Sequence, residues 1–187
     1  MSLSEKMTFK VVSAVLRKKS FLQTELAKET GVSWGRMNKI VQWLVKRGYV
    51  RKTGKYELIS PGALISLLVT EVELEKKSFE IQVPPEKILS WAKKQKAVLC
   101  LSTALNFYSS YFRDPSINLY YSKELEEHLQ NAEEGLTQVY LVKSSLQLLK
   151  EDVVKEKGFL MTDKIRTIID LFADKKAYVT GPLLKKL

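Results

Sequence analysis

The chain has 187 residues, and 45% of them are hydrophobic, which is enough for one large domain or two small ones with separate cores. Glycine and proline are sparse, with 8 and 5 residues, so the composition excludes a disordered chain. No apolar run reaches the roughly 18–20 residues that a membrane span needs, and no basic-then-apolar leader opens the chain. We therefore expect a cytoplasmic protein with no membrane contact.

The net charge of +10 is concentrated in the first third of the chain. Residues 1–62 contain 13 basic and 4 acidic side chains, which gives them a net charge of +9 and leaves +1 for the rest. Solubility alone does not require such an asymmetry. A polyanion that docks on the N-terminal region is therefore the expected partner.

The first third predicts helices followed by a hairpin. Apolar residues recur at helical spacing over residues 5–18, Thr24 and Ser33 suit helix N-caps, and Gly31 and Gly48 suit helix ends. A plausible two-residue turn, Thr53-Gly54, separates two short strands, and Ser60-Pro61 begins a further helix. We expect helices over 5–18, 25–30, 34–47 and 61–72, and strands over 49–52 and 55–58.

The stretch from Glu25 to Ser33, ELAKETGVS, resembles the helix-turn-helix consensus of many prokaryotic regulators. The continuation to Leu44 and the segment Gly48-Tyr49-Val50 resemble it as well. The resemblance implies that residues 1–72 form a winged helix-turn-helix domain that binds double-stranded DNA. The chain is then a sequence-specific transcriptional regulator.

A recognition helix must bury one face and present polar groups on the other. At helical spacing the inner stripe of residues 34–47 is apolar, with Met37, Ile40, Val41 and Leu44. The outward residues are of types that pair with base edges or phosphates, and the hairpin adds basic residues for phosphates. The candidate DNA-binding residues are Ser33, Trp34, Gly35, Arg36, Asn38, Lys39, Gln42, Arg51, Lys52 and Lys55.

One alternative stays open, because winged helices also serve as protein–protein assembly modules that bind no DNA. Trp43 and Val45 fall where this helix is usually polar. We expect them to pack on the second domain or on a partner chain, and the second case would make the protein a homodimer.

The second domain is expected over residues 78–187, after a charged stretch at 71–77 that we interpret as a hinge. Its strands alternate with helices, which is typical of a mixed α/β domain. Thr162 suits an N-cap. The pattern predicts strands at 78–83, 117–121, 137–142, 153–154 and 159–161, and helices at 85–94, 97–112, 123–132, 163–173 and 181–187.

No catalytic constellation is evident in this domain. The single cysteine and the single histidine exclude an internal disulfide and a cysteine zinc site, so we expect no metal and no cofactor. We expect Cys100 to be buried, His128 to lie on a surface helix, and Asp170 to be a structural hydrogen-bonding carboxylate.

Residues 97–111 followed by Ile117–Tyr120 resemble the opening helix and strand of a nucleotidyltransferase-like fold. The segment from Met161 to Leu171 resembles the C-terminal helix of AbiEi-like, antitoxin-type regulators of type IV toxin–antitoxin systems. Those proteins join a winged helix to such a domain and repress their own promoter. The resemblance implies autorepression and a cognate toxin protein as a partner.

Active nucleotidyltransferases carry a Gly-Ser pair and a strand with two carboxylates one residue apart, which hold catalytic metals. The corresponding stretches here, Leu101–Ala104 and Ile117–Tyr120, lack the glycine and both carboxylates. The resemblance therefore implies a non-catalytic α/β domain, and we do not expect an enzyme.

Overall fold

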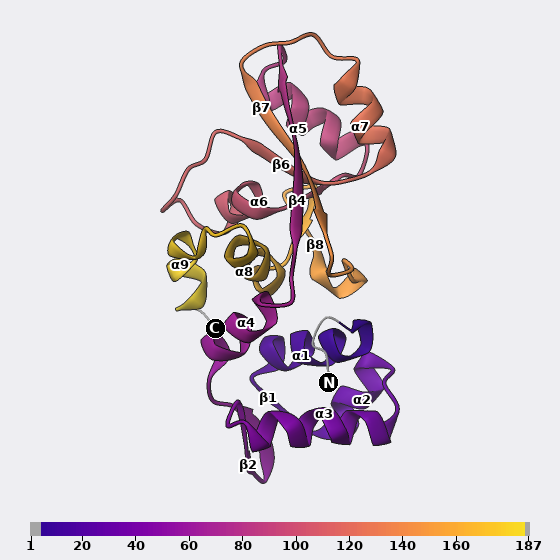
Figure 1. Cartoon of the computed structure of the whole chain (residues 1–187), viewed down its shortest axis with the longest axis vertical. Coiled ribbons are helices and arrows are strands. Elements are labelled where there is room, and N and C mark those ends of the chain that lie inside the picture. Colours follow the sequence, from indigo (N-terminus) through magenta and orange to yellow (C-terminus); the bar gives the residue numbers. More distant parts are fainter. Residues whose placement is uncertain (1–4, 186–187) are drawn as a thin grey trace. The chain divides into compact units, whose positions relative to one another are not determined.

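The computed structural model describes residues 5–185, which divide into two compact units (Figure 1). Of the described residues, the first unit contains those up to Val72 together with Leu184 and Lys185, and the second unit is Glu73–Leu183. The described residues form nine α-helices, a three-stranded sheet and a six-stranded sheet, which confirms the mixed α/β class. None of these helices is both long and apolar enough to cross a membrane.

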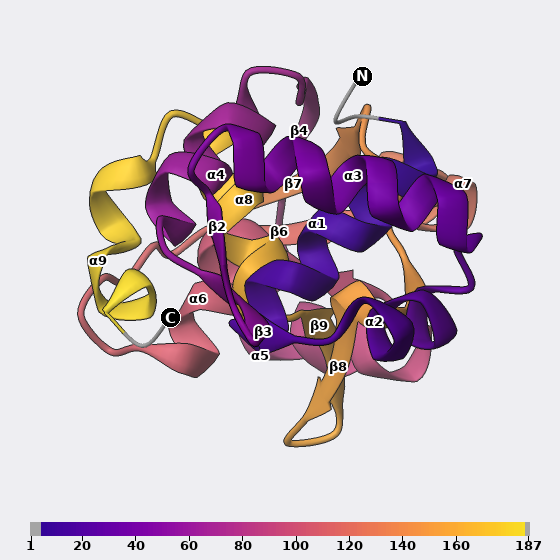
Figure 2. The same ribbon diagram turned by 90° about the horizontal axis from the view of Figure 1, so that it is seen from below.

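The first unit contains four helices and a small antiparallel sheet with the order β1-β3-β2 (Figure 2). Its core is formed by side chains such as Phe9, Phe21 and Leu26, each at most 1% exposed. The elements are α1 (Lys6–Lys18), β1 (Ser20–Phe21), α2 (Gln23–Thr30), α3 (Trp34–Lys46), β2 (Val50–Thr53), β3 (Lys55–Leu58) and α4 (Pro61–Val69).

The predicted glycine positions at the helix ends are confirmed, since Gly31 and Gly48 have φ of 66° and 75°, where side chains are strained. The prediction of a two-residue turn at Thr53-Gly54 is wrong. Thr53 pairs directly with Lys55, and Gly54 alone closes the hairpin with φ of 97°. Ser33 occupies the N-cap position of α3 without a side-chain cap hydrogen bond.

Helix α2 begins earlier than predicted, because the chain leaves β1 directly into it. Leu22 is the N-cap residue and Thr24 lies inside the helix. Strand β1 was not predicted at all, since its two residues are a strand only through their pairing with β3, where Phe21 lies opposite Tyr56.

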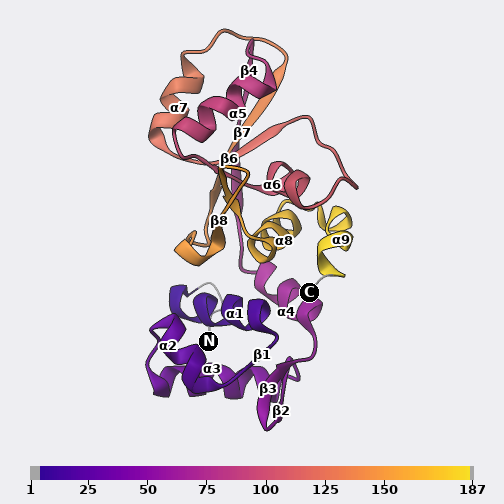
Figure 3. The ribbon, with the colours of Figure 1, turned by 180° about the vertical axis from the view of Figure 1, so that it is seen from behind.

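The second unit is a six-stranded mixed sheet with helices packed on it, in the strand order β4-β7-β6-β5-β9-β8. The pairs β6–β7 and β5–β9 are parallel, and the others are antiparallel. Figures 1 and 3 show α5 beside α7, and α6 beside α8. The elements are β4 (Leu74–Ile81), α5 (Pro85–Lys94), β5 (Val98–Leu99), α6 (Leu101–Tyr108), β6 (Ile117–Tyr120), α7 (Lys123–Gln130), β7 (Thr137–Ser144), η1 (Lys150–Asp152), β8 (Val153–Glu156), β9 (Phe159–Thr162), α8 (Lys164–Ala173), η2 (Ala177–Val179) and α9 (Gly181–Leu184).

Four predictions for this unit are corrected by the structure. The presumed hinge is half strand, because β4 begins at Leu74 and pairs along its whole length with β7. The single helix over 97–112 is instead β5 followed by α6, since Leu99 pairs with both Leu119 and Met161. The cap of α8 is Asp163, whose carboxylate accepts the backbone N–H of Arg166 at 2.7 Å, and Thr162 belongs to β9. The predicted last helix ends at Leu184, and residues 186–187 of that prediction lie outside the described residues.

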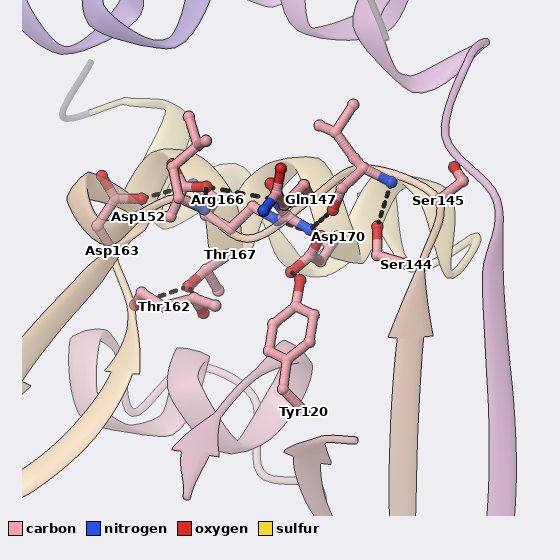
Figure 4. A network of polar contacts seen from close by, with 12 residues as sticks. Tyr120, Ser144, Ser145, Gln147, Asp152, Thr162, Asp163, Arg166, Thr167 and Asp170 are labelled. Carbon is pink, nitrogen blue, oxygen red and sulfur yellow. Dashed lines mark hydrogen bonds and ion pairs between the residues drawn. The ribbon is translucent and has the colours of Figure 1, made fainter. Parts of the chain in front are cut away.

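A buried arginine joins α8 to the loop that follows β7 (Figure 4). The Arg166 side chain is 0% exposed, and its Nε donates to Asp170 at 2.8 Å while one terminal nitrogen lies 3.3 Å from Asp152. Its terminal nitrogens also donate to the carbonyl oxygens of Leu146 and Gln147, at 2.8 and 3.3 Å. Burial opposes the charge, but the neighbouring carboxylates hold the pKa of Arg166 above its usual value. The guanidinium therefore stays ionised inside the unit.

The network extends to the sheet through Tyr120, whose hydroxyl donates to Asp170 at 2.5 Å. Asp152 also accepts a hydrogen bond from the backbone N–H of Leu149 at 2.8 Å, at the end of the loop that follows β7. Asp170 is thus a structural carboxylate, as predicted.

We expect Arg166→Leu to lower the free energy of unfolding by about 3–5 kcal/mol, because it leaves two buried carboxylates without their cation. Urea unfolding followed by circular dichroism measures this loss. Arg113→Leu is the matched control at an exposed arginine and should cost less than about 0.5 kcal/mol. A loss below about 1 kcal/mol for Arg166→Leu would contradict the importance of the network.

Candidate nucleic-acid interface

Helix α3 buries the inner stripe that its sequence predicts. Met37, Ile40, Val41 and Leu44 are each at most 1% exposed. Because successive residues turn by roughly 100° around a helix, burial of this stripe determines the direction of every other side chain of α3.

The residues directly opposite the buried stripe are Gly35, Lys39, Gln42 and Lys46, and all four are exposed. We call these four residues the outer stripe. A Cβ at Gly35 would meet no heavy atom within 4 Å, so this end of the stripe is open. Lys46 was missed by the sequence analysis, although the same helical spacing points to it. The outer stripe is flat, polar and basic, as a surface for an anionic partner requires.

Arg36 and Asn38 lie on opposite flanks of α3 rather than on the outer stripe. Arg36 forms an ion pair with Glu5, which precedes α1. Asn38 accepts a hydrogen bond from the side-chain amide of Gln23 of α2 at 3.4 Å. Each therefore already has a partner within the unit, which competes with any contact to a ligand.

The β2–β3 hairpin presents the three basic residues that the sequence predicts, and all three are exposed. A terminal nitrogen of Arg51 lies 3.3 Å from the carboxylate of Glu57 directly across the hairpin. Side-chain hydrogen bonds, first from Thr53 and then from Arg51, lower the pKa of Glu57. The Lys52 ammonium lies 5.8 Å from the centre of the Tyr56 ring. Lys52 and Lys55 are thus the hairpin cations that are not balanced by Glu57.

A groove of about 730 Å³ runs beside the outer stripe, between Thr8 of α1 and α3. Its α3 side is formed by residues including Gly35, Arg36, Lys39 and Trp43. Trp34 stands at the start of α3 with 55% of its surface exposed. The groove is thus bordered by the cationic Arg36 and Lys39 and by the aromatic Trp43, and Trp34 is not among its lining residues.

The half-buried Trp43 finds its contacts within the first unit. Its ring lies 6.1 Å from that of Tyr49, and the guanidinium of Arg47 lies 4.7 Å from its centre. The expectation that Trp43 and Val45 pack on a second domain or on a partner chain stays a prediction, although Trp43 already has these contacts within the unit.

In the second unit, the single cysteine and the single histidine of the chain lie in different surroundings. Cys100 is buried between β5 and α6, where burial raises the pKa of its thiol well above the usual value, whereas His128 is exposed on α7. Asn118 donates to the Ser102 hydroxyl at 2.8 Å and is itself buried. Among residues 5–185, no three His, Cys, Asp or Glu side chains gather in a way that would hold a metal ion.

Comparison with known proteins gives no relative for this chain. No family model matches it, and neither a curated protein nor a solved structure is significantly similar to it. The functional argument therefore depends on the residues themselves.

We expect Trp43→Ala to lower the free energy of unfolding by about 1–3 kcal/mol, because it removes an aromatic pair and a cation–π contact from a half-buried site. Trp34→Ala is the matched control and should cost less than about 0.5 kcal/mol, since Trp34 is mostly exposed. Urea unfolding of both variants tests this. Equal losses, or a changed sedimentation coefficient for folded Trp43→Ala, would instead favour packing of Trp43 on another domain or chain.

Proposed function

We propose that the chain is a transcriptional regulator whose first unit is a winged helix-turn-helix domain that binds double-stranded DNA in a sequence-specific manner. The observation that carries the proposal is the outer stripe of α3, which is exposed and polar directly opposite a fully buried apolar stripe. It lies in the third of the chain that holds +9 of the +10 net charge.

The order of elements in the first unit supports this proposal. Helices α2 and α3 are joined by a tight turn at Gly31, and the β2–β3 hairpin follows α3 at once. Pairing with β1 anchors this hairpin, which would act as the wing. An α-helix fits the major groove, and basic residues on an adjacent hairpin then meet phosphates.

The structure suggests a division of roles among the candidate residues. Gln42 is of the type that pairs bidentately with adenine, and Lys39 reaches guanine or phosphate from the same stripe. Lys46, Lys52 and Lys55 suit phosphates. Arg36 would contribute only after leaving Glu5.

For the second unit we propose a nucleotidyltransferase-like domain without catalysis. The support is the succession α5-β5-α6-β6-α7-β7 and the residues at the positions of the two metal-binding carboxylates. Those positions hold Asn118 and Tyr120, whose side chains bond to Ser102 and Asp170 inside the unit. For the whole chain, the finer form of the proposal is an autorepressing, antitoxin-type regulator. It would bind DNA as a homodimer and pair with a cognate toxin protein.

Exposed apolar side chains near the start of α1 and α3 favour a second candidate function, a winged-helix assembly module that binds protein. Trp34 and Met7 are 55% and 40% exposed, and exposed apolar side chains of this size mark many protein contacts. The two functions differ in their response to salt and to DNA sequence.

We expect binding to duplex DNA to weaken by about 10³-fold or more between 50 and 200 mM salt, because several phosphate contacts release counterions. Fluorescence anisotropy with a labelled duplex measures the slope. Replacing Lys52 or Lys55 by Gln should flatten the log–log slope by about one unit each. Salt-insensitive binding, or no binding at low salt, would favour the assembly module.

Substitutions in the outer stripe and in the hairpin should have different effects on affinity for a DNA site selected from random sequences. Gln42→Ala should cost about 1–3 kcal/mol on the selected site and relax preference at one or two base pairs, whereas Lys55→Ala should weaken selected and scrambled duplexes alike. Arg36→Ala and Asn38→Ala should cost less than Gln42→Ala, because both are already paired. Titrations of each variant against both duplexes provide the comparison.

Lys94→Ala, an exposed lysine of α5, is the control and should change neither affinity. Equal losses on both duplexes for Gln42→Ala would show that α3 does not read bases.

A further inference from the structure

A cavity of about 480 Å³ in the second unit belongs to none of the features above. It lies between α5 and α7, with β5 and the end of β6 as its floor. Its volume is in the range of small-molecule sites, which are typically lined by aromatic side chains and a few polar groups. The side chains that characterise it are Trp91, Gln95, Lys96, Tyr121, Glu124 and His128.

Two aromatic rings that stack on each other line this cavity. Trp91 of α5 and His128 of α7 stack with their ring centres 4.1 Å apart and their planes inclined by 15°. Tyr121 adds a third aromatic side chain to the lining. A flat apolar group therefore finds aromatic surface here.

Side chains of opposite charge also line this cavity. Lys96 lies just after the end of α5, two residues beyond Lys94, and Glu124 lies on α7, four residues before His128. The lining thus holds one ammonium and one carboxylate besides the aromatic rings.

Both charged groups are available to a ligand. The Lys96 side chain has no ion-pair partner among residues 5–185. The Glu124 carboxylate accepts hydrogen bonds from the backbone N–H of Glu124 and from the Ser122 hydroxyl, and these bonds lower the pKa of Glu124. The carboxylate is therefore ionised at neutral pH. A carboxylate has more acceptor sites than these two bonds occupy.

The remaining wall of the cavity is held by the buried arginine network. Tyr120 lines the cavity while its hydroxyl is bonded to Asp170, and Leu148 lines it from the loop whose carbonyls accept hydrogen bonds from Arg166. Side chains that are fixed before binding lose little freedom when a ligand arrives.

We propose that this cavity binds a free aromatic α-amino acid. Its ring would stack on the Trp91–His128 pair, its carboxylate would pair with Lys96, and its ammonium would pair with Glu124. Such a ligand carries an ammonium, a carboxylate and an aromatic ring within a few bonds of one another, which matches a lining that holds one carboxylate, one ammonium and aromatic side chains. An aromatic acid would leave Glu124 unsatisfied, and an aromatic amine would leave Lys96 unsatisfied.

Isothermal titration calorimetry of the full chain tests the proposal with L-phenylalanine, 3-phenylpropionate and phenethylamine. L-phenylalanine should bind with a stoichiometry of one, and each analogue at least about tenfold more weakly, because each lacks one charge-assisted hydrogen bond. Lys96→Gln should weaken L-phenylalanine about tenfold and leave phenethylamine unchanged. Glu124→Gln should weaken L-phenylalanine similarly and leave 3-phenylpropionate unchanged.

Lys94→Gln and Glu127→Gln are matched controls on the same two helices, since both residues are exposed and neither lines the cavity. They should bind L-phenylalanine like the unaltered chain. The absence of saturable binding, equal affinity for all three compounds, or equal effects of the cavity and control variants would overturn the proposal. These outcomes are independent of DNA binding by the first unit.

Discussion

The burial of one apolar stripe of α3 is the constraint on which the candidate interface depends. Once Met37, Ile40, Val41 and Leu44 are inside, the regular turn of the helix leaves Gly35, Lys39, Gln42 and Lys46 as the only residues directly opposite them. The flanking residues are turned toward α1 and α2, where Glu5 and Gln23 contact them. A partner of this helix therefore meets a narrow polar stripe first. The arginine and asparagine that look most suited to base recognition lie at its margins.

In the second unit a comparable constraint comes from one buried charge. A guanidinium without solvent is tolerable only when carboxylates and carbonyl oxygens occupy its donors, and Arg166 has both. Because Arg166 bonds to carbonyl oxygens of the loop after β7, this loop packs on α8. Arg166 also holds Asp170 in place, and Asp170 accepts the hydrogen bond that orients Tyr120. The same loop and the same tyrosine form part of the cavity wall. The polar network and the proposed ligand site are therefore two consequences of one buried ion pair, and weakening the first should loosen the second.

Local sequence rules predicted the elements that depend on local interactions. Helix α5 has the predicted bounds, because a proline at its start and amphipathic spacing define it, and the buried stripe of α3 follows from periodicity alone. Strands β1 and β5 have two residues each and exist only through partners far along the chain, so no local pattern reveals them. The same limit applies to the site. Lys46 and the basic hairpin are visible in the sequence, whereas the Glu5–Arg36 pair requires a contact across thirty-one positions.

The proposal that the second unit is a nucleotidyltransferase-like domain without catalysis has a physical basis in β6. Two metal-binding carboxylates on alternate residues of a strand repel each other and need a bound cation to stay close. At the corresponding residues of β6, Asn118 satisfies its amide with three hydroxyl groups, and Tyr120 donates to a carboxylate that Arg166 already neutralises. The strand thus keeps its polar inner positions without needing a metal. On that proposal the missing carboxylates also remove a metal-dependent place for phosphates, and the surplus positive charge of the chain lies in residues 1–62, which contain α1 and α2 as well as α3 and its hairpin. On the proposed function, polyanion binding belongs to the first unit alone, which leaves the second unit free to bind a small zwitterion.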